Sequence, residues 1–270
     1  GLDGGGIEIG CEHQGKATED IIVRNNLFYN NEVCGIALGG YAYPDGSGKV
    51  VRAKVVNNTF FQNDFSKSYT GEIYLSYCES CTLLNNIFYL SQQNVLAYAE
   101  RGQPEYYADY NLIFSPGGSN NLEVDWNGKS YLGFSAYQSG TGLEANSLFA
   151  DPLFVNPSLP EPDLHLTSQS PAIGAGDPFY QPDSTEIDLD GQPRLNGETV
   201  DIGVDEFYQN SIRQNLLPLC STIQRFGKTE QIKKIGSWQQ EFILPRNYQG
   251  KIFNLRGKEL FPGGTNYLSC

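Results

Sequence analysis

The stretch Asn25-Asn26-Leu27-Phe28 recurs along the chain with little change. It returns as Asn57-Asn58-Thr59-Phe60 and Asn85-Asn86-Ile87-Phe88, and more loosely as Asn111-Leu112-Ile113-Phe114. The Asn-Asn pairs start 32 and then 28 residues apart. Self-similarity at a period of about 20–50 residues is typical of a solenoid, in which each repeat is one turn of chain stacked on the previous one.

Short apolar runs around this motif have the pattern of β-strands. Three β-branched or leucine runs precede it, at residues 21–23, 55–56 and 83–84, and a second kind of run occupies residues 6–10, 35–39 and 72–76. In the second kind, apolar side chains alternate with others, as Ile7 and Ile9 do around Glu8. A period of two residues indicates a strand with one buried face. The sequence therefore predicts an all-β fold, a parallel β-helix.

Stacking predicts specific columns of side chains. Equivalent positions of successive coils should lie about 4.8 Å apart, so Phe28, Phe60 and Phe88 should form one internal column. The Asn side chains should form a hydrogen-bonded ladder at a corner. Asn also tolerates the left-handed backbone that a sharp corner needs. The Asn pairs are therefore predicted to be structural and not a ligand site.

Charge excludes some functions and divides the chain. Its 270 residues carry 31 Asp plus Glu against 18 Lys plus Arg, a net charge of −13, which argues against binding nucleic acid. No run of 18 apolar residues exists, so no membrane span is expected. Residues 211–270 carry a net +6 and residues 1–210 therefore −19. Such asymmetry marks a change of module.

Three regions are expected. Residues 1–147 should form the coils, 148–207 the last coils and a closing cap, and 208–270 a basic tail with a small β-rich module. The chain starts without Met or a leader, and its first strand-like run begins near residue 6, which favours a piece of a longer protein that lacks its first coils. Residues 41–50 are turn formers and should project as a loop.

Several motifs together resemble one family. They are the run at residues 3–12, the Asn-Asn-x-Phe repeats, residues 148–154, Ser-Pro-Ala-Ile-Gly-Ala-Gly-Asp-Pro at 170–178, and Asp188-x-Asp190-Gly191-x-x-Arg194 followed by Asp201-Ile202-Gly203. They look like the right-handed parallel β-helix proteins of the pectate-lyase-like superfamily, over roughly residues 3–207. The resemblance implies a monomeric right-handed parallel β-helix, secreted or at the bacterial cell surface. Parts of 253–268 are similar to C-terminal sorting domains of secreted bacterial proteins, with a small β-module of unknown role equally open.

The resemblance also implies a chemistry. In the resembling enzymes the substrate is usually an acidic polysaccharide lying along one sheet, and a frequent reaction is β-elimination at a uronic acid. That reaction needs a base and a cation that neutralises the carboxylate, often calcium. Lys54 and Arg52 are the candidate bases. Glu8, Glu72 and Glu12, expected to face outward, are the candidate calcium ligands.

Tyr41, Tyr43, Tyr74 and His13 are the candidate substrate-binding residues, because tyrosine rings stack on sugar faces. Two other functions stay open. One is a non-catalytic carbohydrate-binding or cell-surface scaffold, favoured because the acidic body would repel a polyuronate unless calcium bridged the two. The other is a glycoside hydrolase, which needs two carboxylates about 5–10 Å apart. The Asp-Asp constellation of pectin-hydrolysing β-helices is not evident.

Two smaller motifs have structural interpretations. Asp188-Leu189-Asp190-Gly191 could begin a calcium loop, but few carboxylates are local and no bidentate Glu follows, so pairing of these acids with Arg194 inside the cap is favoured. Cys78-x-x-Cys81 has the spacing of half a zinc site, yet no second pair answers it and the chain has only two His. Small buried thiols are expected there.

Overall fold

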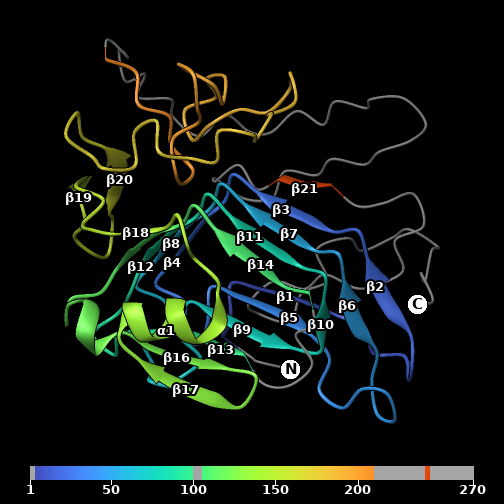
Figure 1. The fold of residues 1–270 in the computed structure, drawn as a ribbon. Coiled ribbons are helices and arrows are strands. Elements are labelled where there is room, and N and C mark those ends of the chain that lie inside the picture. The colour runs from blue at the N-terminus through green and yellow to red at the C-terminus, as the bar shows by residue number, and fades with distance from the viewer. Residues whose placement is uncertain (1–3, 100–104, 210–240, 244–270) are drawn as a thin grey trace.

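The computed structural model describes residues 4–99, 105–209 and 241–243 (Figure 1). The described chain is nearly all β, and its parallel sheets are stacked as a β-solenoid of about four coils. The fold class predicted from the repeats is therefore confirmed. None of its helices is long or apolar enough to cross a membrane, among the residues described.

Each of the first three coils contributes one short strand to each of four sheets. The first coil has β1 (Ile7–Gly10), β2 (Ala17–Glu19), β3 (Ile22–Arg24) and β4 (Leu27–Tyr29). The second has β5 (Ile36–Gly39), β6 (Lys49–Val51), β7 (Lys54–Val56) and β8 (Thr59–Phe61). The third has β9 (Ile73–Ser76), β10 (Cys78–Glu79), β11 (Thr82–Leu84) and β12 (Ile87–Tyr89). The fourth has β13 (Val95–Ala99), β14 (Tyr107–Asp109) and β15 (Leu112–Phe114).

Corresponding strands of successive coils pair in parallel. Sheet 1 is β1-β5-β9, sheet 2 is β2-β6-β10, sheet 3 contains β3-β7-β11-β14, and sheet 4 contains β4-β8-β12-β15 followed by β18 (Leu148–Phe149). In sheet 4, Phe28 pairs with Phe60 and Phe60 with Phe88. Their rings stack with centroids 4.8 and 5.0 Å apart inside the core. The predicted phenylalanine column is confirmed.

The two asparagines of each Asn-Asn pair have different roles at the corner between sheets 3 and 4. The second Asn of each pair forms a buried ladder, in which Nδ2 donates to Oδ1 of the next coil over 3.0–3.1 Å: Asn26 to Asn58, Asn58 to Asn86, and Asn86 to Asn111. The first Asn turns the corner, with φ of 54° at Asn25, Asn57 and Asn85. Both predicted roles of asparagine are confirmed, each at a different residue of the pair.

A hairpin and a helix close the far end of the solenoid. After η1 (Ser119–Asn121), β16 (Glu123–Trp126) pairs in parallel with β13 and antiparallel with β17 (Lys129–Leu132), and α1 (Phe134–Thr141) follows. Trp126, Phe134 and Tyr137 are buried in the same apolar core as the coil interiors. This element covers the end of the core, which a solenoid must hide.

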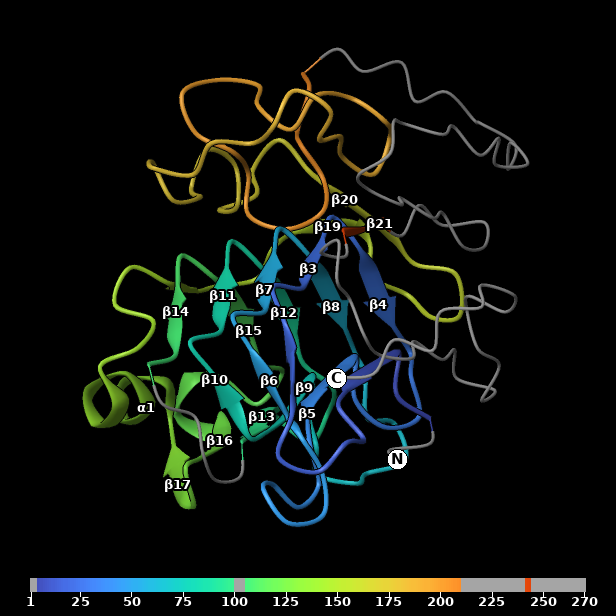
Figure 2. The same ribbon diagram turned by 90° about the vertical axis from the view of Figure 1, so that its right-hand side faces the viewer.

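Residues 148–207, which we call the closing segment, lie along the flank of the coils and not over their end. They contain β18 (Leu148–Phe149), β19 (Phe154–Asn156) and β20 (Asp163–Leu166). Figures 1 and 2 show the yellow and orange chain beside the corner where β3, β7 and β11 end.

The composition of sheet 4 explains this position. Its strands are apolar on both faces, so the outer face needs cover as well as the inner one. Residues of the closing segment pack on that outer face in a second apolar cluster: Leu27, Phe61, Ile87 and Leu112 from the coils with Phe154, Leu164, Leu166, Ala172 and Ile202. Gly203, with φ of 100°, approaches so closely that a Cβ there would lie 2.6 Å from Ile87 Cδ1.

Most of the basic tail lies outside the described residues. The exception is β21 (Glu241–Ile243), which pairs antiparallel with β3. The predicted resemblance at 253–268 to sorting domains falls outside the described residues.

Candidate functional site

The residues predicted for elimination do not form one site. Lys54 begins β7 in sheet 3, whereas Glu8 lies in β1 of sheet 1, and the strands of sheet 2 separate the two in every complete coil. Both side chains are exposed. A base and the cation that neutralises the same uronate must act on adjacent atoms. These two residues face different sides of the solenoid, so the structure does not bring them together.

Arg52 is engaged by two acids. Its Nε donates to Asp20 Oδ1 at 2.7 Å and its Nη2 to Glu19 Oε2 at 2.6 Å. The hydrogen bond to Asp20, followed by that to Glu19, raises the pKa of Arg52 above its already high usual value. A base must lose its proton, and these contacts favour the protonated form of Arg52. Its φ of 56° identifies it as a corner residue that the ion pairs hold in place.

Glu72 faces inward, and the expectation that it faces outward is wrong. It is only 1% exposed, and its carboxylate accepts hydrogen bonds from the backbone N and Nδ2 of Asn63. Asn63 in turn accepts from Nδ2 of Asn31 at 2.6 Å. Burial raises the pKa of Glu72 to about 8, against the hydrogen bonds from Asn63 that lower it. Glu72 therefore ends a second, shorter amide ladder.

Strand alternation predicts the wrong orientation for Glu72 because this residue stands just before the strand. Ile73, the first residue of β9, is also fully buried, so two consecutive side chains face the interior where the chain enters the strand. Alternation holds within a strand and not at its ends.

Glu12 and His13 are exposed in the loop after β1. Among the described residues, the carboxylates and imidazoles that lie close enough to share an ion do not include Glu8, Glu12 or Glu72. The predicted calcium ligands therefore do not converge.

Two tyrosine pairs flank β9 and form what we call the tyrosine face. Tyr74 of β9 stacks on Tyr98 of β13, with ring centroids 5.6 Å apart and planes within 6°. Tyr77, directly after β9, lies 6.0 Å from Tyr43 of the 41–50 loop. All four rings are partly exposed.

Two of the predicted sugar-binding residues, Tyr43 and Tyr74, thus belong to the tyrosine face, each beside a tyrosine of the neighbouring coil or loop. Tyr41 is exposed at the tip of the same loop, where its hydroxyl donates to the carbonyl of Gly46 at 2.7 Å. Lys49 lies over the Tyr43 ring, 5.3 Å from its centroid. This side of the molecule therefore combines aromatic rings with a cation.

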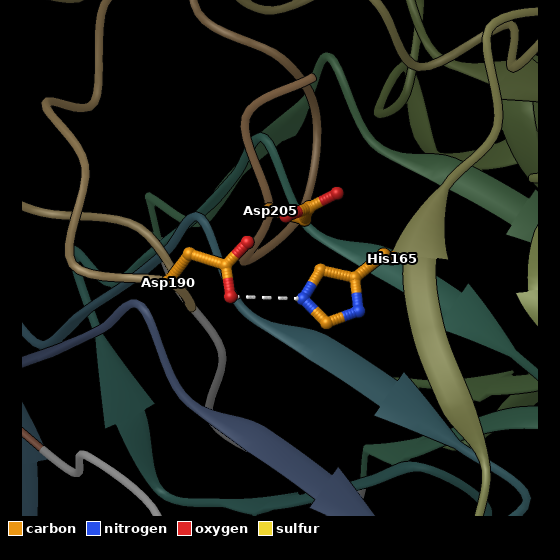
Figure 3. A group of neighbouring side chains, drawn as sticks. All are labelled: His165, Asp190 and Asp205. Carbon is orange, nitrogen blue, oxygen red and sulfur yellow. Dashed lines mark hydrogen bonds and ion pairs between the residues drawn. The ribbon is translucent and has the colours of Figure 1, made fainter. Parts of the chain in front are cut away.

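A separate polar cluster lies in the closing segment (Figure 3). One possible ligand atom each from His165, Asp190 and Asp205 lies within 4.8 Å of the others. His165 Nε2 is 3.2 Å from Asp190 Oδ1, and its Nδ1 is 2.5 Å from Asp163 Oδ1. Asp205 Oδ2 accepts the backbone N–H of Leu166 at 2.8 Å. The cluster joins β20, the 188–191 turn and the last residues of the segment.

The acids of this cluster are partly deprived of solvent. Burial raises the pKa of Asp205, and the nearby charges of Asp188 and Asp190 raise it further, against the lowering effect of His165. Burial likewise raises the pKa of Asp188 to about 6. For His165, burial lowers the pKa, but the charges of Asp205, Asp163 and Asp190 outweigh it and the net shift is upward.

Arg194 is paired inside the closing segment, as expected, although with a different acid. The side chain is fully buried, and Nη2 donates to the carbonyl of Asp201 at 2.9 Å and lies 3.2 Å from Glu206 Oε1. Asp188 instead accepts the backbone N–H groups of Asp190 and Gln192 through Oδ1. The ion pair expected with Asp188 or Asp190 is therefore not the one formed, and the acid that pairs with Arg194 is Glu206.

A buried glutamate fastens the closing segment to the coils. Glu186 accepts hydrogen bonds from Arg24 Nη1 at 3.0 Å, Asn57 Nδ2 at 2.9 Å and the Tyr180 hydroxyl at 2.7 Å. Because these contacts are internal and saturate the carboxylate, we interpret the group as structural. The thiols of Cys78 and Cys81 are buried and unoxidised, as the sequence indicated.

Comparison with known proteins gives one weak likeness to report. The chain is 28% identical over 169 residues to the uncharacterized protein YwoF of Bacillus subtilis, which covers 62% of this chain and 35% of that protein. The chain thus spans about a third of the relative's length. No protein-family model matches, and no solved structure does either. These comparisons assign no activity.

Proposed function

We propose that this chain is a secreted or cell-surface β-helix that binds polysaccharide through the tyrosine face without cleaving it. The observation that carries the proposal is the pair of tyrosine contacts on either side of β9, Tyr74 with Tyr98 and Tyr77 with Tyr43. Partly exposed tyrosines offer an apolar ring to a sugar face and a hydroxyl to its hydroxyl groups.

The spacing of the tyrosines suits an extended ligand. Tyr74 and Tyr77 are three residues apart on and just beyond one strand, which corresponds to roughly 10 Å at the rise of an extended chain. Tyr98 extends the surface to the next coil. A rigid sheet with loops at its edge is a surface that holds such rings without a large loss of conformational entropy on binding.

Charge favours a particular class of polysaccharide. Residues 1–210 carry a net −19, so a polyuronate would be repelled unless cations bridged it to the protein. An uncharged polysaccharide meets no such penalty. We therefore propose a neutral polysaccharide as the ligand, and expect an acidic one to bind only with calcium.

Calcium-assisted β-elimination follows from the family resemblance alone. The described residues support it less well, because Arg52 is ion-paired and Lys54 lies on another face than Glu8. It has its own readout, an unsaturated product absorbing near ~235 nm that Lys54→Ala would abolish.

Affinity electrophoresis of the full chain tests the binding proposal. The gels contain neutral polysaccharides, or acidic ones with and without calcium, and absorbance near ~235 nm is followed in parallel. We expect retardation by a neutral polysaccharide, lost in the double variant Tyr74→Ala with Tyr98→Ala. Tyr107→Ala is the matched control, because Tyr107 is 46% exposed but lies in sheet 3. Equal retardation of all variants would contradict the proposal, and so would an unsaturated product.

A further inference from the structure

The closing segment contains a donor set that the polysaccharide proposal does not use. His165, Asp190 and Asp205 come from three separate parts of the segment, yet their ligand atoms lie within 4.8 Å of one another. Ligands about 2.1 Å from a zinc ion stand roughly 3–4 Å apart. Modest rotation of the two carboxylates would therefore close the set around one ion.

The imidazole is oriented as metal-bound histidines commonly are. Its Nδ1 is 2.5 Å from Asp163 Oδ1, so a proton on Nδ1 is held by this carboxylate, and Nε2 faces Asp190 Oδ1 at 3.2 Å. A carboxylate behind a ligating histidine fixes the ring and raises its basicity. Asp163 and His165 both belong to β20, so the strand itself holds this pair.

A second, independent observation concerns Asp188. This side chain is only 2% exposed, and its Oδ2 is buried with no hydrogen-bond partner. A buried carboxylate oxygen without a donor is costly. Asp188 Oδ1 accepts the backbone N–H of Asp190 at 3.0 Å, so this carboxylate stands beside a member of the cluster. The charge of Arg194 acts on Asp188, but Oδ2 accepts no hydrogen bond, and a cation beside the cluster would interact with this oxygen.

We propose that His165, Asp190 and Asp205 bind a divalent transition-metal ion of the zinc type, supported by Asp163 behind the histidine. An imidazole in the set favours such an ion over calcium or magnesium, which prefer oxygen ligands alone. The ion ties β20 to the 188–191 turn and to the end of the closing segment. This site is distinct from the tyrosine face and does not depend on the polysaccharide.

In the absence of a metal, His165 can instead be protonated and form ion pairs with Asp163 and Asp190. The two arrangements differ in the state of Nε2, which carries a proton in one and coordinates the ion in the other. Nitrogen NMR of the histidine rings separates them directly.

The chain has only two histidines, His13 and His165, so selective ¹⁵N-histidine labelling of the full chain gives two assignable rings. We expect one equivalent of Zn²⁺ to shift the Nε2 signal of His165 to a coordinated value and to keep Nδ1 protonated. The exposed His13 ring should be unaffected, and the same concentration of Ca²⁺ should leave both rings unchanged. Equal responses of the two rings, or none at His165, would overturn the proposal.

Conservative variants test the ligand set. Asp190→Asn and Asp205→Asn should each weaken Zn²⁺ binding, measured by competition with a chelator of known affinity, by at least ~10-fold, and Asp163→Asn by about 10-fold. Glu161→Gln is the matched control, because Glu161 is an exposed acid two residues before Asp163. Asp190 is partly exposed, so Asp190→Asn keeps the test valid if Asp205→Asn does not fold. Unchanged affinity in Asp190→Asn would overturn the proposal.

Thermal unfolding tests the tying role. Zn²⁺ at about 100-fold over its dissociation constant should raise the Tm of the full chain by about 5–10 °C. The rise should be absent in Asp190→Asn and retained in Glu161→Gln. An equal rise in both variants would contradict a site at this cluster.

Discussion

The coils and the closing segment bury polar groups in opposite ways. Along the ladder the coils bury neutral amides, with an acid such as Glu72 only where a ladder ends, and each rung repeats the same Asn-to-Asn contact. The closing segment buries charges in individual ion pairs, such as Arg194 with Glu206 and Glu186 with Arg24. A repeated neutral contact costs little desolvation and is satisfied from coil to coil, whereas a buried charge depends on one specific partner. Removal of a single side chain should therefore affect the stability of the two regions differently.

The largest effect is expected at Arg194. Arg194→Met leaves the buried carboxylate of Glu206 without its cation, which should lower the free energy of unfolding by about 3–5 kcal/mol. Because only the closing segment depends on this pair, hydrogen exchange should increase in residues 163–207 and stay slow in the coils. Adding Glu206→Gln removes the orphaned charge and should recover part of the loss. Loss of protection throughout the coils would refute the distinction.

A smaller loss is expected in the middle of the amide ladder. Asn58→Ala removes the acceptor of Asn26 and the donor to the carbonyls of Val23 and Val56, at a cost of about 3 kcal/mol. Denaturant unfolding should remain a single transition, since every coil shares the ladder. Asn120, exposed in η1, provides the control, and Asn120→Ala should change stability by less than about 0.5 kcal/mol. Equal effects of the two variants would contradict a structural ladder.

The repeat made the coils predictable. It predicted the phenylalanine column and the asparagine ladder, because each depends on identical residues at equivalent positions of successive coils. The cluster around His165 has no such periodicity. Asp188 and Asp190 were recognised as an acidic pair, but His165 and Asp205 join Asp190 only through the path of the closing segment over sheet 4. The one hint in the sequence was the alternation of Asp163 and His165, which places both side chains on one face of a strand.

The predicted side-chain orientations on the coils agree with the structure where strand alternation holds. Tyr74 stands within β9 and faces outward as predicted, whereas Glu72 stands before the strand and faces inward. Arg52 illustrates a second limit, since its partners Glu19 and Asp20 are on the preceding coil, about 32 residues earlier. A lone basic residue in sequence can be one half of an ion pair in space.

A pH-dependent effect is expected where the two amide ladders end. Asn63 donates to Glu72, and Asn111 Nδ2 donates to Glu144 Oε2 at 2.9 Å. Burial raises the pKa of Glu72 to about 8 and that of Glu144 to about 7. Since both folded-state values exceed the unfolded value, the folded state holds protons that the unfolded state releases. The contribution of these two groups to the free energy of unfolding should therefore be fully present below about pH 4.5. It should be lost as the pH rises toward 8.

Glu72→Gln tests this dependence, because a glutamine keeps an acceptor for Asn63 and cannot ionise. The decline in unfolding free energy between pH 5 and 8, followed by urea denaturation, should become shallower by about 1–3 kcal/mol. Glu8→Gln, on the exposed side of β1, serves as the comparison and should leave the slope as it is. An unchanged slope in Glu72→Gln would show that Glu72 is not a buried acid.

The smallest effect is expected at the surface of the coils. Arg52→Ala breaks contacts with Glu19 and Asp20 that are about half exposed, and exposed ion pairs contribute roughly 0–1 kcal/mol. Thermal unfolding at low and high salt should give a loss within that range, and smaller at high salt. A loss comparable to that of Arg194→Met would remove the contrast between surface and closing-segment charges.

A crystal structure of the full chain tests the central claim most directly, namely that like side chains stack coil upon coil while the closing segment covers the flank. The account predicts one column of Phe28, Phe60 and Phe88 with adjacent ring centroids near 4.8 and 5.0 Å, and Ile202 against Ile87 on the outer face of sheet 4. Phenylalanines in separate clusters, or a closing segment seated over the end of the coils, would contradict it.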